Sequence, residues 1–188
     1  LVGAAYERPD IAMRIALTYN TAITNKFSGV HNFATPVTAD FKSPESLNLE
    51  FQTGIAADTL LMAGVRYVDW TETVIAPAHN LARPGGGVLQ SYSEPSYSWN
   101  VGVGRKFTDA LSGSISVGYE QAQGGITGNL APTDGYRSVA LGAKYAMNNM
   151  DISGGIQYRA IGDATSTGAG GANGTFTGNS AVAMGIKV

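Results

Sequence analysis

Residues 99–120 read WNVGVGRKFTDALSGSISVGYE, and apolar residues alternate with small or polar ones in both halves of this stretch. The first half places Trp99, Val101 and Val103 on one face of an extended chain, with Asn and Gly between them. The second half repeats the alternation after a break at residues 108–110. Because successive side chains of a β-strand point to opposite faces, the stretch predicts two antiparallel strands joined by a tight turn.

The same two-residue period recurs along the whole chain. Alternating segments cover residues 2–6, 11–19, 47–55, 60–70, 97–103, 114–120, 139–145, 152–159 and 181–188. In segment 60–70, Trp70 falls on the face opposite Val65 and Tyr67, which predicts a β-bulge there. No helical period competes with this pattern, so we expect an all-β, antiparallel chain of about nine strands with essentially no helix.

The composition fits a sheet with one apolar face and one face of small polar residues. Charged residues make up 14% of the chain, below the usual quarter of a soluble domain, and there are 25 glycines. A net charge of -2 excludes the basic footprint of a nucleic-acid-binding protein. The absence of cysteine excludes disulfides and thiolate metal sites.

No apolar run in the sequence is long enough for a transmembrane helix, which needs roughly 18 residues. The longest run, LLMAGV at residues 60–65, is far shorter. If the chain spans a membrane, it must therefore do so as a closed barrel, because there every backbone N–H and C=O is paired between strands.

The connections between the expected strands alternate in length. Tight turns are predicted around Pro9, Asp58, Asp109 and Asn149, and the long loops are residues 24–38, 77–95, 123–134 and 162–179. Outer-membrane barrels have short periplasmic turns and long extracellular loops in this order. A soluble β-sandwich also alternates, but its solvent face is richer in charge. The pattern therefore favours an up-and-down transmembrane β-barrel.

Aromatic residues gather toward the ends of the expected strands. Those toward the long loops are Tyr19, Phe27, Phe41, Trp70, Tyr97, Trp99, Tyr119, Tyr136 and Tyr158, and those toward the short turns are Tyr6, Phe107 and Tyr145. Such an arrangement predicts two aromatic girdles at the membrane interfaces.

Isolated charges interrupt the small-polar face of the strands. They are Arg14, Glu50, Arg66, Glu120, Lys144, Arg159 and Lys187. A Lys or Arg that faced lipid at mid-membrane would cost about 2–4 kcal/mol, so we expect these side chains to point into the lumen. There they would either form a salt-bridge network that stiffens the barrel or bind a ligand.

The sequence holds no catalytic constellation: a nucleophile elbow, a zinc-protease motif and a phosphate loop are all missing. His31 and His79 are predicted to be solvated loop residues, not the histidine of a phospholipase-type Ser-His pair. We therefore expect no enzyme activity, no cofactor and no metal site.

Three stretches resemble the FadL/TodX family of outer-membrane transporters for long-chain fatty acids and hydrocarbons. They are YERPDIAMRIALTYN at residues 6–20, GVRYVDWTE at residues 64–72 and the stretch 99–120. The resemblance covers nearly all of the chain. It implies a barrel of roughly fourteen strands with an N-terminal hatch in its lumen. Residues 1–188 would then be a single transmembrane β-barrel region that supplies the C-terminal part.

The resemblance also implies a function: passive uptake of long-chain fatty acids or related hydrophobic compounds across the outer membrane of a Gram-negative bacterium. The partners would be that compound and outer-membrane lipid. Arg14, Arg66, Lys144 and Arg159 are the ligand-binding candidates of the lumen, with an arginine meeting the carboxylate of a fatty acid. The alternatives are a structural or adhesive barrel whose surface loops bind partners, and a porin for small solutes.

About nine strands are too few to close a barrel of the family's size. The first and last strands would each expose unpaired backbone groups, which cost several kcal/mol apiece in hydrocarbon. We therefore expect this chain by itself to form either an open, curved sheet or a smaller barrel whose edges pair.

Overall fold

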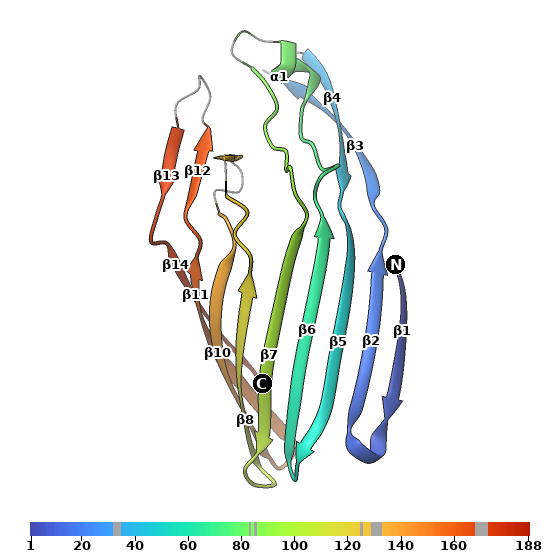
Figure 1. Cartoon of the computed structure of the whole chain (residues 1–188), viewed down its shortest axis with the longest axis vertical. Coiled ribbons are helices and arrows are strands. Elements are labelled where there is room, and N and C mark those ends of the chain that lie inside the picture. Colours follow the sequence, from blue (N-terminus) through green and yellow to red (C-terminus); the bar gives the residue numbers. More distant parts are fainter. Residues whose placement is uncertain (32–34, 83, 85, 125, 129–132, 168–172) are drawn as a thin grey trace.

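A computed structural model of the chain describes residues 1–31, 35–82, 84, 86–124, 126–128, 133–167 and 173–188. Nine strands form one antiparallel sheet in which neighbours in the sheet follow one another along the chain (Figure 1). They are β1 (Val2–Arg8), β2 (Met13–Asn20), β5 (Glu45–Ala56), β6 (Thr59–Asp69), β7 (Ser96–Lys106), β8 (Leu111–Glu120), β10 (Tyr136–Met147), β11 (Met150–Ile161) and β14 (Ser180–Lys187). The all-β, up-and-down architecture predicted from the sequence is confirmed.

The large sheet is curved but open. Within the described residues β1 pairs only with β2, and β14 pairs only with β11. All residues of both edge strands are exposed. Of the two forms expected for this chain by itself, the structure has the open one.

The tight turns all lie at one end of the sheet, as Figure 1 shows. The first contains a short 3-10 helix, Pro9–Ile11, and ends at Ala12 with a φ of 50°. Asp58 and Asn148 also take left-handed φ angles, of 56° and 52°; Asp and Asn tolerate this conformation better than most residues. The hairpins predicted around Pro9, Asp58, Asp109 and Asn149 are confirmed, although β2 starts at Met13 instead of residue 11.

The prediction of a β-bulge in segment 60–70 is wrong. β6 pairs with β7 without a break from Thr59 to Val68, and β6 ends at Asp69. Trp70 follows the strand on the side of Arg66 and Val68, where unbroken alternation places it. The register shift of this hairpin occurs instead between Gly54 and Ala56 of β5, beside the turn.

The long connections carry structure of their own at the opposite end of the sheet (Figure 1). β3 (Ile23–His31) pairs with β4 (Thr35–Ser43), where the sequence predicted a loop. β9 (Ile126–Thr127), β12 (Ala164–Thr167) and β13 (Asn173–Phe176) form a small three-stranded sheet. The single α-helix of the described residues, α1 (Ala78–Ala82), is one turn long. No helix of the described residues is long and apolar enough to cross a membrane.

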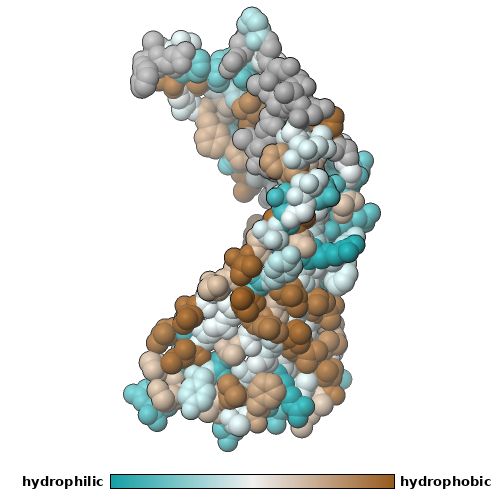
Figure 2. Space-filling model, turned by 90° about the vertical axis from the view of Figure 1, so that its left-hand side faces the viewer, coloured by the Kyte–Doolittle hydropathy of each residue, from teal (hydrophilic) through white to brown (hydrophobic). Residues whose placement is uncertain are grey.

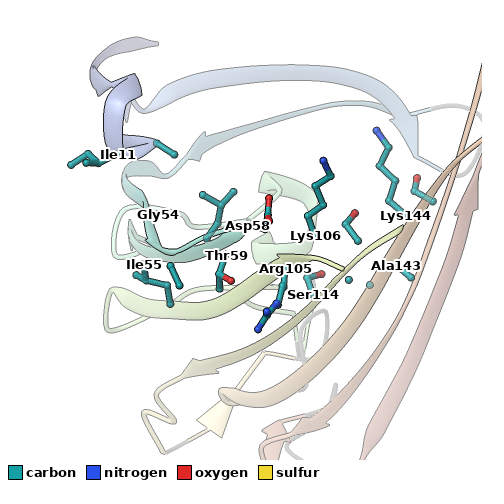
Figure 3. Close-up of a pocket in the computed structure, with 18 of the residues that line it drawn as sticks. Ile11, Gly54, Ile55, Asp58, Thr59, Arg105, Lys106, Ser114, Ala143 and Lys144 are labelled. Carbon is teal, nitrogen blue, oxygen red and sulfur yellow. The ribbon is translucent and has the colours of Figure 1, made fainter. Parts of the chain in front are cut away.

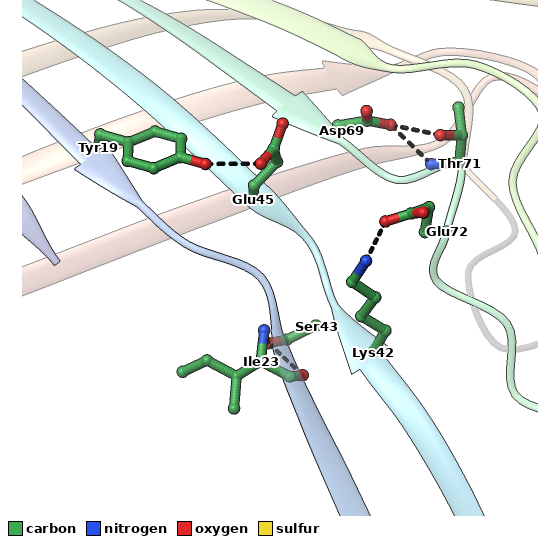
Figure 4. A network of polar contacts seen from close by, with 8 residues as sticks. All are labelled: Tyr19, Ile23, Lys42, Ser43, Glu45, Asp69, Thr71 and Glu72. Carbon is green, nitrogen blue, oxygen red and sulfur yellow. Dashed lines mark hydrogen bonds and ion pairs between the residues drawn. The ribbon is translucent and has the colours of Figure 1, made fainter.

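Polar contacts lie on both sides of the point where the β3–β4 hairpin leaves the large sheet (Figure 4). Tyr19 donates a hydrogen bond to Glu45 (2.7 Å) between β2 and β5, the Ser43 hydroxyl donates to the Ile23 carbonyl (3.1 Å) within the hairpin, and the Lys42–Glu72 ion pair joins the hairpin to the connection after β6. The hairpin continues β2 and β5, because only residues 21 and 22 separate β2 from β3 and only Pro44 separates β4 from β5.

Candidate lumenal site

The pairing register sorts the side chains of the sheet into an apolar and a polar face. One row of paired residues reads Ile15, Phe51, Ala63, Val101, Val117, Val139, Tyr158 and Val182. The adjacent row on the other face reads Ala16, Glu50, Gly64, Asn100, Gly118, Ser138, Arg159 and Ala181. Both faces thus keep their character from strand to strand.

Large apolar side chains stand exposed on the apolar face, such as Leu141, which is 54% exposed. Figure 2 shows hydrophobic residues gathered over the part of the molecule that the large sheet occupies, between a hydrophilic rim and hydrophilic loops. A continuous exposed apolar belt of this kind is the lipid-facing surface of an outer-membrane barrel. The polar face is then the lumenal face.

An aromatic girdle lies on the lipid-facing side near the long connections. Its ring pairs are Tyr67–Tyr97, with centroids 5.1 Å apart, and Trp99–Tyr119, with centroids 5.5 Å apart. Tyr136 was predicted to belong to it but pairs with Glu120 on the lumenal face. The girdle therefore follows the register, and not merely the distance from a loop.

Two arginines lie on the lipid-facing side, which sequence reasoning missed. Arg105 is paired with Gly113 near the short turns, and Arg137 is paired with Tyr119 at the level of the girdle. Both lie near strand ends, where a long side chain can reach the membrane interface.

Two of the four predicted ligand residues are held in ion pairs on the lumenal face. Arg14 contacts Glu7 at 3.1 Å and Glu50 at 3.7 Å. Lys144 contacts Asp151 at 2.7 Å. These side chains are about half exposed, so water screens their attraction and the pairs contribute little to stability.

The other two candidates have neutral partners. Arg66 donates a hydrogen bond to the Asn48 side-chain oxygen at 3.2 Å. The Arg159 guanidinium carbon lies 3.9 Å from the centre of the Tyr136 ring, which is a cation–π contact. All four candidates lie on the lumenal face, but on β2, β6, β10 and β11, and none contacts another among the described residues.

A hollow of about 1000 Å³ lies at the short-turn end of the lumenal face, and we call it the lower hollow (Figure 3). Its floor is a row of mostly small residues, namely Gly54, Leu60, Gly104, Ser114 and Gly142. Lys106 and Lys144 project to the same side of the sheet in Figure 3, whereas Arg105 projects to the other. Lys106 contacts Asp109 in the short turn at 2.7 Å and thereby lowers the pKa of that carboxyl group. The two lysines of this largely apolar hollow, Lys106 and Lys144, are therefore both held in ion pairs.

A second hollow, of about 530 Å³, lies beneath the long connections, and we call it the upper hollow. Arg66 lines it, together with Trp70, Gln90, Tyr92 and Glu120. The Trp70 and Tyr92 rings lie 5.1 Å apart, and the Trp70 indole donates a hydrogen bond to Ser96 at 3.0 Å. Trp70 is thus a lumenal residue and not part of the predicted girdle. Arg66 is the one predicted ligand residue that lines this hollow, and Lys144 is the one that lines the lower hollow.

The two histidines contact each other, although we expected solvated loop residues. The rings of His31 on β3 and His79 on α1 have centroids 4.5 Å apart, and Nδ1 of His79 is buried. Among the described residues no three His, Cys, Asp or Glu side chains gather as they would around a metal ion.

The antiparallel sheet with a lipid-facing and a lumenal side defines the class: the wall of an outer-membrane-type β-barrel. Neither a family model nor a curated protein matches the chain. A solved FadL homologue from Pseudomonas aeruginosa is similar with a TM-score of 0.71 and 16% identity, over 98% of this chain and 49% of that one. The CymD monoaromatic hydrocarbon channel is similar with a TM-score of 0.54 and 15% identity, over 85% of this chain and 45% of that one.

The chain therefore spans about half the length of the solved structures that it matches. At such low identity the likeness shows the fold, and it is the FadL-like fold that the resemblance predicted.

Proposed function

We propose that this chain is part of an outer-membrane conduit for passive uptake of hydrophobic compounds, long-chain fatty acids among them, in a Gram-negative bacterium. The observation that carries the proposal is the lower hollow, a large apolar space on the lumenal side of a lipid-facing sheet. Its volume lies at the upper end of the roughly 300–1,000 Å³ that is usual for ligand sites. The likeness to a FadL homologue and to a channel named for monoaromatic hydrocarbons supports the same function.

Movement through such a conduit follows the concentration gradient of the compound, so it requires no cofactor. The small residues Gly104 and Gly142 leave room for an acyl chain, because a larger side chain at either position would project into the lower hollow. The four cationic ligand candidates have different roles in this proposal. Arg66 and Lys144 line the hollows and meet the polar end of the cargo, whereas Arg14 and Arg159 hold neighbouring strands through their own partners.

The same proposal includes a closed barrel in the membrane. The outer edges of β1 and β14 carry backbone groups that would be unpaired in hydrocarbon, and each such group costs several kcal/mol. We propose that further strands pair with both edges and complete the wall around the two hollows.

One observation favours a second candidate, a surface barrel that binds external partners. Ile23 and Phe27, on one face of the β3–β4 hairpin, are 59% and 54% exposed at the end of the molecule that faces outward in a barrel. Apolar side chains grouped on an outward hairpin are typical of a protein contact.

Uptake by cells separates the two functions. A strain that lacks the gene for this protein would be complemented with the natural gene, with Gly104→Phe, or with Gly29→Phe, and its uptake of labelled oleate measured. A Cβ on Gly104 has ordinary contacts, at 3.5 Å from Met62, and the ring of a phenylalanine there would fill the lower hollow. Gly29 lies on β3 outside both hollows, and a Cβ there meets nothing within 4 Å.

We expect the natural gene and Gly29→Phe to restore oleate uptake and Gly104→Phe to reduce it severalfold. Equal uptake by the deletion strain and the complemented strain would exclude transport and favour the partner-binding function.

A further inference from the structure

Three lysines lie in one row across the short-turn end of the lumenal face, with a serine between each two. Lys106 is paired in register with Ser112, Ser112 with Lys144, Lys144 with Ser153, and Ser153 with Lys187. Because neighbouring strands are about 4.8 Å apart, successive lysines of this row are anchored about 10 Å apart, with a hydroxyl group midway.

This row forms the border of the lower hollow. Lys106, Ser112, Lys144 and Ser153 all line that hollow, and its floor of mostly small residues is the next row, two residues further along each strand. Figure 3 shows Lys106 and Lys144 projecting to the same side of the sheet. A largely apolar space therefore ends at a row of cations and hydroxyl groups, which is the arrangement that suits an amphiphile with an anionic end.

Ser112 marks the point where two of the cations can meet one ligand. It lies one strand from Lys106 and one strand from Lys144. An ammonium group has three donors on a flexible stem, and a serine hydroxyl adds a fourth kind of contact as donor or acceptor. A carboxylate above Ser112 can therefore accept hydrogen bonds from both lysines and from the hydroxyl group.

The ion pairs of the two lysines leave this position accessible from the hollow. Lys106 contacts Asp109 in its turn, and Lys144 contacts Asp151, which is paired with Ala146 one row nearer the turn. Both carboxylates thus lie on the turn side of the lysines, whereas the hollow lies on the other side. Asp109 is fully exposed and Asp151 largely so, and water weakens such pairs enough for a second anion to share the lysines.

The other charged residues that line the hollow do not oppose an anion at Ser112. Asp10 is held by Arg8 at 2.7 Å, and Asp58 lies in the turn between β5 and β6. Arg105 projects to the opposite side of the sheet. Among the described lining residues, the charges that the strands present to the hollow are therefore the two lysines.

We propose that Lys106, Ser112 and Lys144 form a carboxylate site at the short-turn end of the lower hollow. The acyl chain of a fatty-acid anion lies along the floor of small residues, and its carboxylate accepts hydrogen bonds from the two ammonium groups and the Ser112 hydroxyl. This inference rests on the proposed function and deepens it. It names a long-chain carboxylate as the preferred cargo of the hollow and orients the charged end toward the short turns, where a neutral hydrocarbon finds no partner.

Calorimetric titration of the whole protein in a nonionic detergent tests the site, with the same titration of protein-free micelles subtracted. The ligands are decanoate and 1-decanol, which have chains of the same length, at about pH 8.5, where carboxyl groups are ionised. The variants are Lys106→Gln with Lys144→Gln, and Asp109→Asn with Asp151→Asn. The control is Lys26→Gln, an exposed lysine on β3 outside both hollows.

The two double variants should shift decanoate affinity in opposite directions. We expect loss of the two lysines to weaken decanoate about tenfold, because two charge-assisted contacts are removed, and to leave decanol within about twofold. Loss of the two aspartates should strengthen decanoate severalfold, because it frees the same lysines for the ligand. Lys26→Gln should change neither ligand. If the lysines only held the turns in place, both double variants would break the same ion pairs and would act alike.

Unchanged decanoate affinity without the lysines, or a weakening of decanoate by both double variants, would overturn the proposal. The aspartate variant keeps the test decisive even if the lysine variant does not fold. Gly104→Phe locates the chain, since it should weaken both ligands by filling the hollow; undiminished decanoate binding there would also overturn the proposal.

Cell uptake reports separately on the proposed function. If oleate uptake survives deletion of the gene while the double variants shift decanoate affinity in opposite directions, transport fails and the carboxylate site stands. If uptake is lost on deletion but the lysine variant binds decanoate like the parent, the carboxylate site fails and transport stands.

Discussion

Substitution of Leu141 by Arg should prevent stable insertion of the sheet, whereas Ala140→Arg should be tolerated. Leu141 is 54% exposed on the lipid-facing side and is paired with Ile115 and Ile156. It lies midway between Arg137 and Tyr145 of β10, four residues from each, or about 13 Å along the strand. With a strand tilt of roughly 40° this is about 10 Å along the membrane normal, close to the midplane.

An arginine at that depth costs about 2–4 kcal/mol, which lowers the folded-to-unfolded ratio by a factor of roughly 30 to 1,000. Ala140 is the matched control, because it is the adjacent residue and faces the lumen between Ser116 and Gln157. The assay is the urea midpoint of the whole protein in lipid vesicles, read by heat-modifiable gel mobility. An Ala140→Arg midpoint at or below that of Leu141→Arg would refute the assignment of the two faces.

Three further changes have defined outcomes. Gly102→Val should destabilise the sheet by about 1–3 kcal/mol in urea titrations, since its Cβ would lie 2.8 Å from the Ser116 Cβ. An equal loss of stability in Gly185→Val, where nothing lies within 4 Å, would argue against steric crowding as the cause. Arg14→Ala should cost less than about 1 kcal/mol in the same titrations, because its ion pairs are exposed; a larger loss would show a stiffening network. This chain alone, refolded in detergent, should stay trypsin-sensitive because its edges are open, and a compact, resistant band would contradict this.

The nine strands and their tight turns could be predicted because their determinants are local. Alternation over a few residues fixes which side chains share a face, and Asp or Asn at a turn marks where the direction reverses. Both kinds of information are contained in a stretch such as residues 99–120, which becomes β7 and β8.

Features that depend on register were predicted less well. Tyr136 and Trp70 lie near strand ends like the girdle residues, but the register places one on the lumenal face and the other beyond its strand. The partners of Arg14 come from strands on both sides of it, so its ion pairs could not be foreseen from β2 alone.

The upper hollow could not be predicted from the sequence at all. It exists because the connection after β6 folds back through the isolated Ile75–Gln90 bridge and brings Gln90 and Tyr92 beside Trp70. The β3–β4 hairpin was missed for a similar reason. Its residues 23–43 alternate weakly, with several polar positions on both faces, and pairing between two such segments depends on their neighbours.

The most direct test of the central claim, a sheet with one face toward lipid and one toward a lumen, is spin-label accessibility along β10. Residues 1–188 contain no cysteine, so single cysteines at positions 138 to 143 can each be labelled in vesicles, in the whole protein with every cysteine outside these residues replaced by serine. Collisions with oxygen report contact with lipid, and collisions with a water-soluble nickel complex report contact with the lumen. We expect oxygen access to peak at Val139, Leu141 and Ala143 and nickel access to peak at the positions between them. An opposite phase, or no two-residue period, would contradict the account.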